Sequence, residues 1–411
     1  MRQLYKYAIL LMSIGIYTWF VGSYIWILLL LAVLVIITSG STSKWVLFIP
    51  ILSLIAGFVA LKYNTTSPNT LSLPIGYSVF AFTCISYIVD TAHNNTKEKK
   101  IPIDVFCYLF FFPKMLAGPI IRFADMQNQL NTCKVPTRKE LYTAFKIIVY
   151  ASFCKYVLAD NLNIVTDYEN YGPNAWLSTF LFAFQLYLDF FAYSNYAIAF
   201  ALLVGINLPE SFNSPYRAAT FRAFWKRWNI TVSSWLKDYV YIPLGGNKKG
   251  NKWRIYANII LTFIVSGLWH GATFPFLLWG VLHGFLVIME RILFRESVIA
   301  NQVLRNIYRW FVFVIASLLW QLFRIEGMDS FFEWIGRLFT LNPINYSILA
   351  ITIVTFLTVY LLDCKIVKHL IFSTSDNKIF VYREVAFVCA LFFLVILFHS
   401  QPQINFFYFK F

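Results

Sequence analysis

Long apolar runs alternate with short polar stretches along most of the chain. A helix that crosses a bilayer needs roughly 20 mostly apolar residues, and many of these runs approach that length. The pattern therefore predicts an all-α polytopic membrane protein with about 10 to 12 transmembrane helices, in a single integral membrane domain, 1–411. The predicted spans are roughly 4–20, 21–38, 44–61, 71–90, 101–121, 142–160, 175–204, 255–271, 275–294, 308–324, 346–363 and 384–400.

The composition supports a membrane protein and excludes several other classes. Apolar residues make up 59% of the chain and charged residues 13%, whereas soluble globular proteins carry about 25% charged residues. The net charge is +15, and the cations cluster between apolar runs. That placement favours membrane lipid over nucleic acid as the partner of the cations. The six cysteines have no metal-ligand spacing, and we expect no metal site.

One polar stretch, 207–254, interrupts the apolar pattern in the middle of the chain. Within it, cations alternate with aromatic residues, among them Trp225, Arg227, Trp228 and Lys237. This mixture is typical of a helix that lies in the membrane interface or re-enters the membrane. A polar segment inside a membrane protein is therefore the first place to look for a functional site.

Ionisable residues inside apolar runs are costly in a membrane and are functional candidates. His270 could act as a general base or make an interhelical hydrogen bond, and the pattern favours neither. His283, in the same apolar stretch, is predicted to be structural or to support a neighbouring site residue. Asp189, Tyr187 and Ser194 lie in one helical stretch, where they would line a tunnel or make polar helix contacts.

Several of these stretches together resemble the membrane-bound O-acyltransferase (MBOAT) family. The similarity is strongest to its alginate O-acetyltransferase-like branch, which is related to the MBOAT proteins of teichoic acid D-alanyl transfer. It covers most of a predicted core, 73–290. The matching segments are LPIGYSVFAFTCISYIVD (73–90), FFPKMLAGPIIRFADMQNQL (111–130), FQLYLDFFAYSNYAIAFALLVGI (184–206), FNSPYRAATFRAFWKRWNITVSSWLKDYVYIPLGGN (212–247) and SGLWHGATFPFLLWGVLHG (266–284).

The resemblance implies spans and re-entrant or interfacial helices arranged around a central tunnel that crosses the bilayer. A thioester donor enters it from the cytoplasm, and an acceptor hydroxyl comes from the other side. The family's essential histidine corresponds to His270. A second position, histidine in much of the alginate branch, is Asn229 in WKRWN, which leaves His270 as the expected base. The candidates for lining the tunnel are Trp225, Arg227, Trp228, Lys237, Asp189, Tyr187, Ser194 and His283.

The C-terminal tail, 401–411, ends in FFYFKF. It resembles a terminal motif of bacterial acyl-transfer systems, in which a tyrosine carries the acyl group. That residue would be Tyr408, which we therefore expect to act as a covalent relay. The alternative is an aromatic anchor in the membrane interface.

The resemblance implies an enzyme, an O-acetyltransferase in a multi-pass arrangement in a bacterial cytoplasmic membrane. We expect no resident cofactor, and acetyl-CoA or another acyl thioester as the donor substrate. The acetyl group would reach a cell-surface polysaccharide directly as the glycan acceptor, or through an extracytoplasmic SGNH-type transferase. The alternatives are D-alanyl transfer to teichoic acid and, more distantly, a non-enzymatic transporter or channel.

Overall fold

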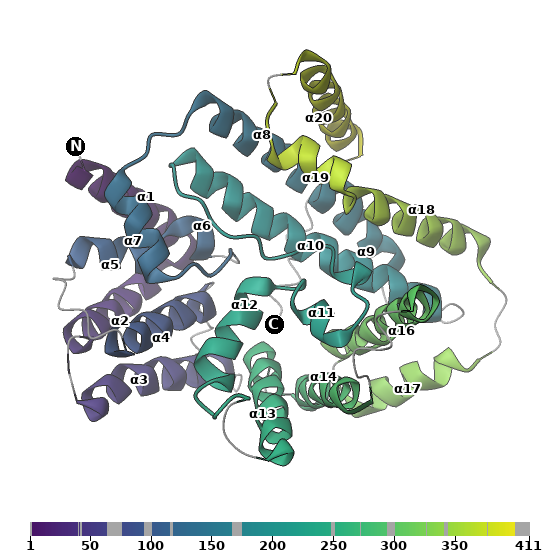
Figure 1. The fold of residues 1–411 in the computed structure, drawn as a ribbon, viewed down its shortest axis with the longest axis horizontal. Coiled ribbons are helices and arrows are strands. Elements are labelled where there is room, and N and C mark those ends of the chain that lie inside the picture. The colour runs from purple at the N-terminus through teal and green to yellow at the C-terminus, as the bar shows by residue number, and fades with distance from the viewer. Residues whose placement is uncertain are drawn as a thin grey trace. The chain divides into compact units, whose positions relative to one another are not determined.

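The computed structural model describes residues 2–39, 41, 43–63, 76–93, 101–115, 118–166, 175–247, 251–271, 273–293, 301–325, 327–340, 344–375 and 377–398. All regular elements within these ranges are helices (Figure 1). The predicted all-α class is therefore confirmed.

Within the described ranges, seven helices are long and apolar enough to cross a membrane. An eighth is added if α18, Tyr346–Leu362, and α19, Lys365–Phe372, form one span bent by 59°. The chain is a multi-pass membrane protein, with fewer qualifying spans than the sequence pattern suggested. One reason is that the first two predicted spans form a single apolar stretch, Arg2–Thr38.

The chain divides into two compact units, Met1–Ala144 with Ser194–Pro209, and Phe145–Tyr193 with Glu210–Phe411. The first unit has a buried apolar core between its helices. Inside that unit, the buried Lys6 pairs with the buried Asp104 at 2.6 Å. The helices of this unit are α1 Arg2–Val21, η1 Gly22–Tyr24, α2 Ile25–Thr38, α3 Lys44–Tyr63, α4 Tyr77–His93, α5 Pro102–Phe110, α6 Phe112–Met115 and α7 Phe123–Thr132.

Two helices, α8 Arg138–Ser152 and α10 Ala175–Leu203, contribute residues to both units. The second unit contains all the elements that carry the histidines of interest. Besides α18 and α19 it comprises η2 Phe153–Ala159, α9 Asp160–Thr166, η4 Pro215–Arg217, α11 Phe221–Trp225, α12 Ile230–Leu236, η5 Lys237–Tyr241, α13 Lys252–His270, α14 Phe274–Leu293, α16 Gln302–Trp320, η6 Gln321–Phe323, α17 Met328–Leu338 and α20 Lys378–Phe398.

Asparagine residues begin several helices of the second unit. The side chain of Asn251 accepts a hydrogen bond from the amide of Arg254 at the start of α13. Asn301 and Asn345 cap α16 and α18 in the same way. A side-chain oxygen at this position satisfies amides that have no partner within the helix. These short polar residues thus set where each apolar helix begins.

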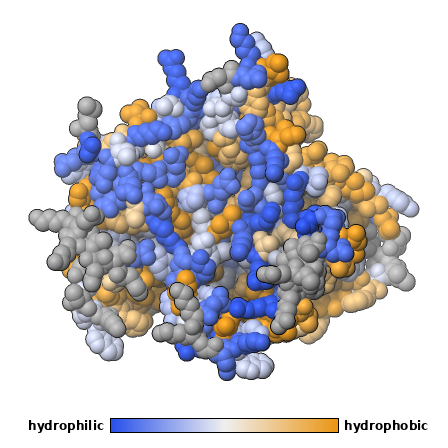
Figure 2. Space-filling model, viewed as in Figure 1, coloured by the Kyte–Doolittle hydropathy of each residue, from blue (hydrophilic) through white to orange (hydrophobic). Residues whose placement is uncertain are grey.

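The outer surface of the second unit fits a membrane environment. Tyr346, Val354 and Leu361 on α18 are 80%, 62% and 61% exposed, and apolar side chains colour this helix orange in Figure 2. An extended exposed apolar surface in a multi-helix protein is typical of contact with lipid.

Two predicted elements differ from the structure. The predicted span 101–121 is broken between α5 and α6 at Phe111. Pro113 explains the break, because it has no amide hydrogen to donate to the preceding helical turn. The polar segment 207–254 forms several short helices rather than one interfacial helix, with a left-handed residue, Asn229, between α11 and α12.

Candidate functional site

A helical hairpin carries the two histidines singled out in the sequence. α13 ends at His270, and α14 follows after a short connection. Glycines allow the two helices to pack closely. A Cβ atom on Gly267 would collide with the backbone carbonyl of Phe276, and one on Gly280 with that of Phe263. The hairpin therefore holds His270 against the first turns of α14.

The His270 imidazole is partly exposed and lies among aromatic rings from other elements. Its centroid is 5.4 Å from the Trp279 ring on α14 and 4.8 Å from the Phe323 ring in η6. Phe276 lies 6.1 Å away, nearly parallel to it. A basic ring that is accessible but surrounded by apolar groups suits a residue that exchanges protons with a substrate.

His283 lies one turn after Trp279 on α14 and is fully buried. Its ring centroid is 4.9 Å from both the Trp225 and the Trp279 ring. Among the described residues, neither nitrogen of His283 has a hydrogen-bond partner, and the same holds for the indole nitrogens of both tryptophans. Such groups are uncommon, because buried polar groups are nearly always hydrogen-bonded. The Trp279 ring thus contacts both His283 and His270.

Asn229 lies at the junction of α11 and α12 with φ of 41°. Asparagine adopts this left-handed conformation more readily than most residues do. The preceding Trp228 is buried against Trp320, with the ring centroids 4.5 Å apart. Trp320 in turn contacts Trp279, which contacts His270. Aromatic rings in tilted and edge-to-face contact therefore connect the WKRWN segment to the histidine hairpin.

A buried carboxylate on α14, Glu290, holds the start of α11. It accepts hydrogen bonds from the amides of Phe221 at 2.7 Å and Arg222 at 3.0 Å. The Tyr308 hydroxyl donates to the same carboxylate at 3.3 Å. One helix, α14, thus carries His283 and also fixes the short helix that presents Trp225.

Asp189 and Tyr187 on α10 belong to buried polar networks. The Lys155 ammonium lies 2.7 Å from a carboxylate oxygen of Asp189 and 2.6 Å from one of Asp160. The Tyr187 hydroxyl donates to Asp363 at 2.8 Å. The Lys155–Asp189 and Tyr187–Asp363 contacts join segments distant in sequence, so these polar residues tie helices of the second unit together.

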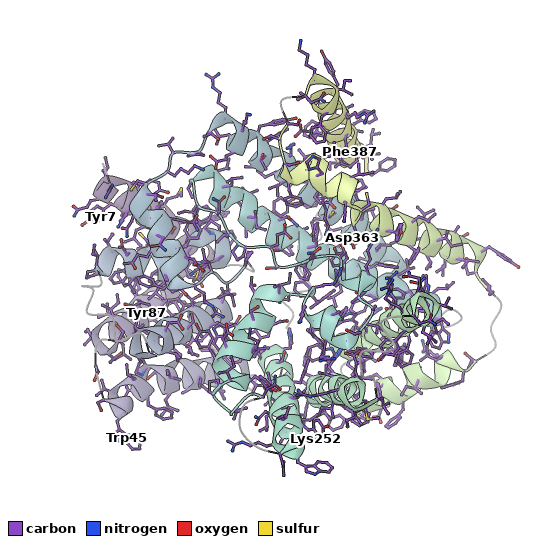
Figure 3. All side chains as sticks on the ribbon, viewed as in Figure 1. Tyr7, Trp45, Tyr87, Lys252, Asp363 and Phe387 are labelled. Carbon is purple, nitrogen blue, oxygen red and sulfur yellow. The ribbon has the colours of Figure 1, made fainter. Side chains whose placement is uncertain are left out.

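The loop before α11 is attached to the break between α18 and α19, where Asp363 is labelled in Figure 3. Ser214 has φ of 50°, and its hydroxyl accepts a hydrogen bond from Lys368 of α19 at 2.8 Å. Arg217 donates to the carbonyl of Tyr360 at 2.6 Å. These bonds connect the bent helix pair to the segment that leads into WKRWN.

Tyr216 joins this loop to the aromatic cluster. Its ring lies 6.0 Å from that of Trp228, and its hydroxyl donates to the carbonyl of Ala183 at 2.7 Å. Removal from water raises the pKa of Tyr216 well above its ordinary value. The phenol therefore stays protonated and acts as a hydrogen-bond donor.

The two cations of the polar segment have different surroundings. Arg227 is partly buried, and its guanidinium lies 3.4 Å from the carbonyl oxygen of Asn213. Lys237 is exposed and lies 3.5 Å from the carboxylate of Asp238. Neither contact joins these cations to the histidine hairpin.

The remaining predicted site residues lie elsewhere. Ser194 is buried and belongs to the first unit. Tyr408 and the tail, 401–411, lie outside the described residues. Their predicted roles stay predictions.

Sequence reasoning missed several residues that build this site. Lys155 lies in an apolar run, so the rule that selected Asp189 could also have found it. Trp279, Trp320 and Phe323 carry no comparable signal, because aromatic residues are common throughout the chain. Only the folded arrangement shows that these three rings meet beside His270.

Residues 14–323 match the membrane-bound O-acyltransferase family, which is more than half of the chain. The chain belongs to this family. The resemblance first seen in the sequence motifs is thereby confirmed, and the match includes both histidines of the hairpin and the WKRWN segment.

Several curated members of the family are similar to the chain. A probable alginate O-acetylase, AlgI, of Azotobacter vinelandii is 34% identical over 297 residues, covering 69% of this chain and 58% of the relative. A peptidoglycan O-acetyltransferase of Helicobacter pylori is 33% identical over 252 residues, covering 59% and 48%. A teichoic acid D-alanyltransferase of Bacillus subtilis is 27% identical over 229 residues, covering 52% and 57%. The chain thus spans about half the length of these relatives.

Proposed function

We propose that this chain is an O-acetyltransferase that moves acetyl from a cytoplasmic thioester, such as acetyl-CoA, across a bacterial cytoplasmic membrane. The acetyl group is destined for a cell-surface polysaccharide. The observation that carries the proposal is the accessible imidazole of His270, placed among aromatic rings in a chain of the O-acyltransferase family. Relatives named for alginate and peptidoglycan O-acetylation support acetyl as the group and a glycan as the acceptor.

In the proposed mechanism His270 is the general base. A hydroxyl oxygen attacks the thioester carbonyl and loses its proton to the imidazole as the new C–O bond forms. The tetrahedral intermediate collapses, the C–S bond breaks, and His270 returns the proton to the departing thiolate. An imidazole suits both steps, because its ordinary pKa is about 6.5.

The WKRWN segment is proposed to hold the donor beside this base. The amide side chain of Asn229 would donate to the developing oxyanion or orient the thioester. Trp225 and Trp228 would line its path, and Arg227 and Lys237 would meet the phosphates of a CoA donor. The exposure of Lys237 is compatible with that role, and equally with anchoring at the membrane interface.

Tyr408 is proposed to carry the acetyl group between two transfers. Its phenol oxygen attacks the thioester, CoA leaves as the thiol, and an acetyl-tyrosine ester remains. A hydroxyl of the acceptor, or of an SGNH-type transferase outside the membrane, then takes the acetyl group and restores the phenol. A phenol ordinarily titrates near pH 10, so it needs a base such as His270 at neutral pH.

Mass spectrometry of the C-terminal peptide tests this proposal. The protein would be purified, supplied with acetyl-CoA and compared with His270→Ala. His369→Ala is the matched control, because His369 is an exposed histidine hydrogen-bonded to Ser373. We expect acetyl on Tyr408 in the wild type and the control, and its loss in His270→Ala. An unmodified wild-type peptide would exclude the relay, and acetyl persisting in His270→Ala would exclude the base.

D-alanyl transfer is the second candidate, because relatives named teichoic acid D-alanyltransferases match over half of the chain. The same measurement separates the two functions. A D-alanyl group on Tyr408, formed from a D-alanyl thioester and not from acetyl-CoA, would support the second.

A further inference from the structure

Trp225 meets the buried Trp279 and His283 in a cluster whose ring nitrogens have no part in the mechanism above. The three rings meet edge to face, with the Trp225 and Trp279 centroids 5.6 Å apart and each 4.9 Å from His283. All four ring nitrogens lack a hydrogen-bond partner among the described residues. A buried polar group without a partner costs about 1–3 kcal/mol, so packing alone does not explain this composition.

The hydrogen-bonding character of the cluster indicates which ligand it fits. An indole can only donate, and a neutral imidazole donates from one nitrogen and accepts at the other. The cluster therefore offers three donors and one acceptor. Its ligand must chiefly accept hydrogen bonds, and the three N–H donors would stabilise negative charge that develops on it.

The position of the cluster links it to the proposed chemistry. Trp279 contacts both His283 and His270, at centroid distances of 4.9 and 5.4 Å. A group hydrogen-bonded by these rings is therefore close to the proposed base. In acyl transfer, the group that needs donors at that place is the carbonyl oxygen, which becomes negatively charged as the hydroxyl attacks.

We infer that Trp225, Trp279 and His283 form the binding site for the carbonyl oxygen of the acyl thioester. This inference rests on the proposed function. The rings bind the neutral carbonyl in the ground state and stabilise the oxyanion in the transition state. Asn229 is then left to orient the donor.

Two donor analogues test the inference by binding alone. Acetyl-dethia-CoA keeps the carbonyl and replaces the thioester sulfur with a methylene group, and ethyl-dethia-CoA lacks only the carbonyl oxygen. Titration calorimetry on the purified protein in detergent measures both affinities. We expect the wild type to prefer the ketone by about tenfold, as one to two net hydrogen bonds imply.

The variants are His283→Phe and Trp225→Phe, which keep an aromatic ring and remove the nitrogens. Each should reduce the preference to about twofold or less, with little change in affinity for ethyl-dethia-CoA. Trp176→Phe is the matched control, because its indole donates to the carbonyl of Leu338 elsewhere in the second unit. That control should keep the full preference. Using two variants keeps the test decisive if one of them fails to fold.

The outcomes separate this inference from the function on which it rests. If the wild type binds both analogues equally, or if both folded variants keep the preference, the carbonyl lies elsewhere and the inference is wrong. If the cluster binds a structural water instead of the carbonyl oxygen, both folded variants keep the preference. If the wild type binds neither analogue, the CoA thioester donor is wrong, and the inference fails with it.

Discussion

Glu290 holds the start of α11, and we predict that weakening this attachment increases local opening of α11. The carboxylate accepts hydrogen bonds from the amides of Phe221 and Arg222 at 2.7 and 3.0 Å, and its side chain is 1% exposed. In Glu290→Gln, the remaining side-chain oxygen still accepts a hydrogen bond from one of these backbone amides. The new NH₂ group is a donor, so it cannot accept a hydrogen bond from the other backbone amide. The variant therefore loses one hydrogen bond to a charged group, which is worth about 1.5–3 kcal/mol.

A loss of about 2 kcal/mol in the stability of α11 corresponds to about a 30-fold increase in its open fraction. Amide hydrogen exchange measured by mass spectrometry on peptides covering 218–229 reports that fraction. We expect exchange there to be about 30-fold faster in Glu290→Gln than in the wild type, with little change in α16.

Glu333→Gln is the matched control. Its carboxylate side chain is 56% exposed and pairs with Arg337 one helical turn away, an arrangement worth about 0.5 kcal/mol or less. Exchange in α11 should be unchanged in this control. An acceleration below about threefold in Glu290→Gln would refute the anchoring role, and equal acceleration throughout the second unit would show a global rather than a local effect.

Three further predictions concern packing and backbone geometry. Gly280→Ala should destabilise the hairpin by about 1–3 kcal/mol or more, because the added Cβ would collide with the carbonyl of Phe263; thermal unfolding in detergent measures the loss. Lys155→Met should cost about 3–5 kcal/mol by leaving the Asp189 carboxylate buried and unpaired, and adding Asp189→Leu should restore part of the unfolding temperature. Asn229→Val should lower that temperature and Asn229→Gly should not, because a β-branched residue is strained at φ of 41°.

Some features could be predicted because they depend on short stretches of sequence. Trp279 and His283 are four residues apart in an apolar helix, so they share one face whatever packs against it. The motif around His270, SGLWHG, could be recognised because its residues are consecutive in the sequence. The predicted span 101–121 was wrong as one helix, although Pro113 lay in it and marked the position of the break.

The amino-acid sequence alone predicts a multi-pass helical membrane protein, its family and the histidine proposed as its base. Apolar run length and local motifs carry that information directly. The folded structure was needed to show that Trp225 gathers around the histidine hairpin together with Trp320 and Phe323, which lie far from it along the chain. Which rings meet depends on glycine-mediated helix packing and on buried ties such as Glu290 with α11. These contacts join residues far apart along the chain, so no local pattern in the sequence predicts them.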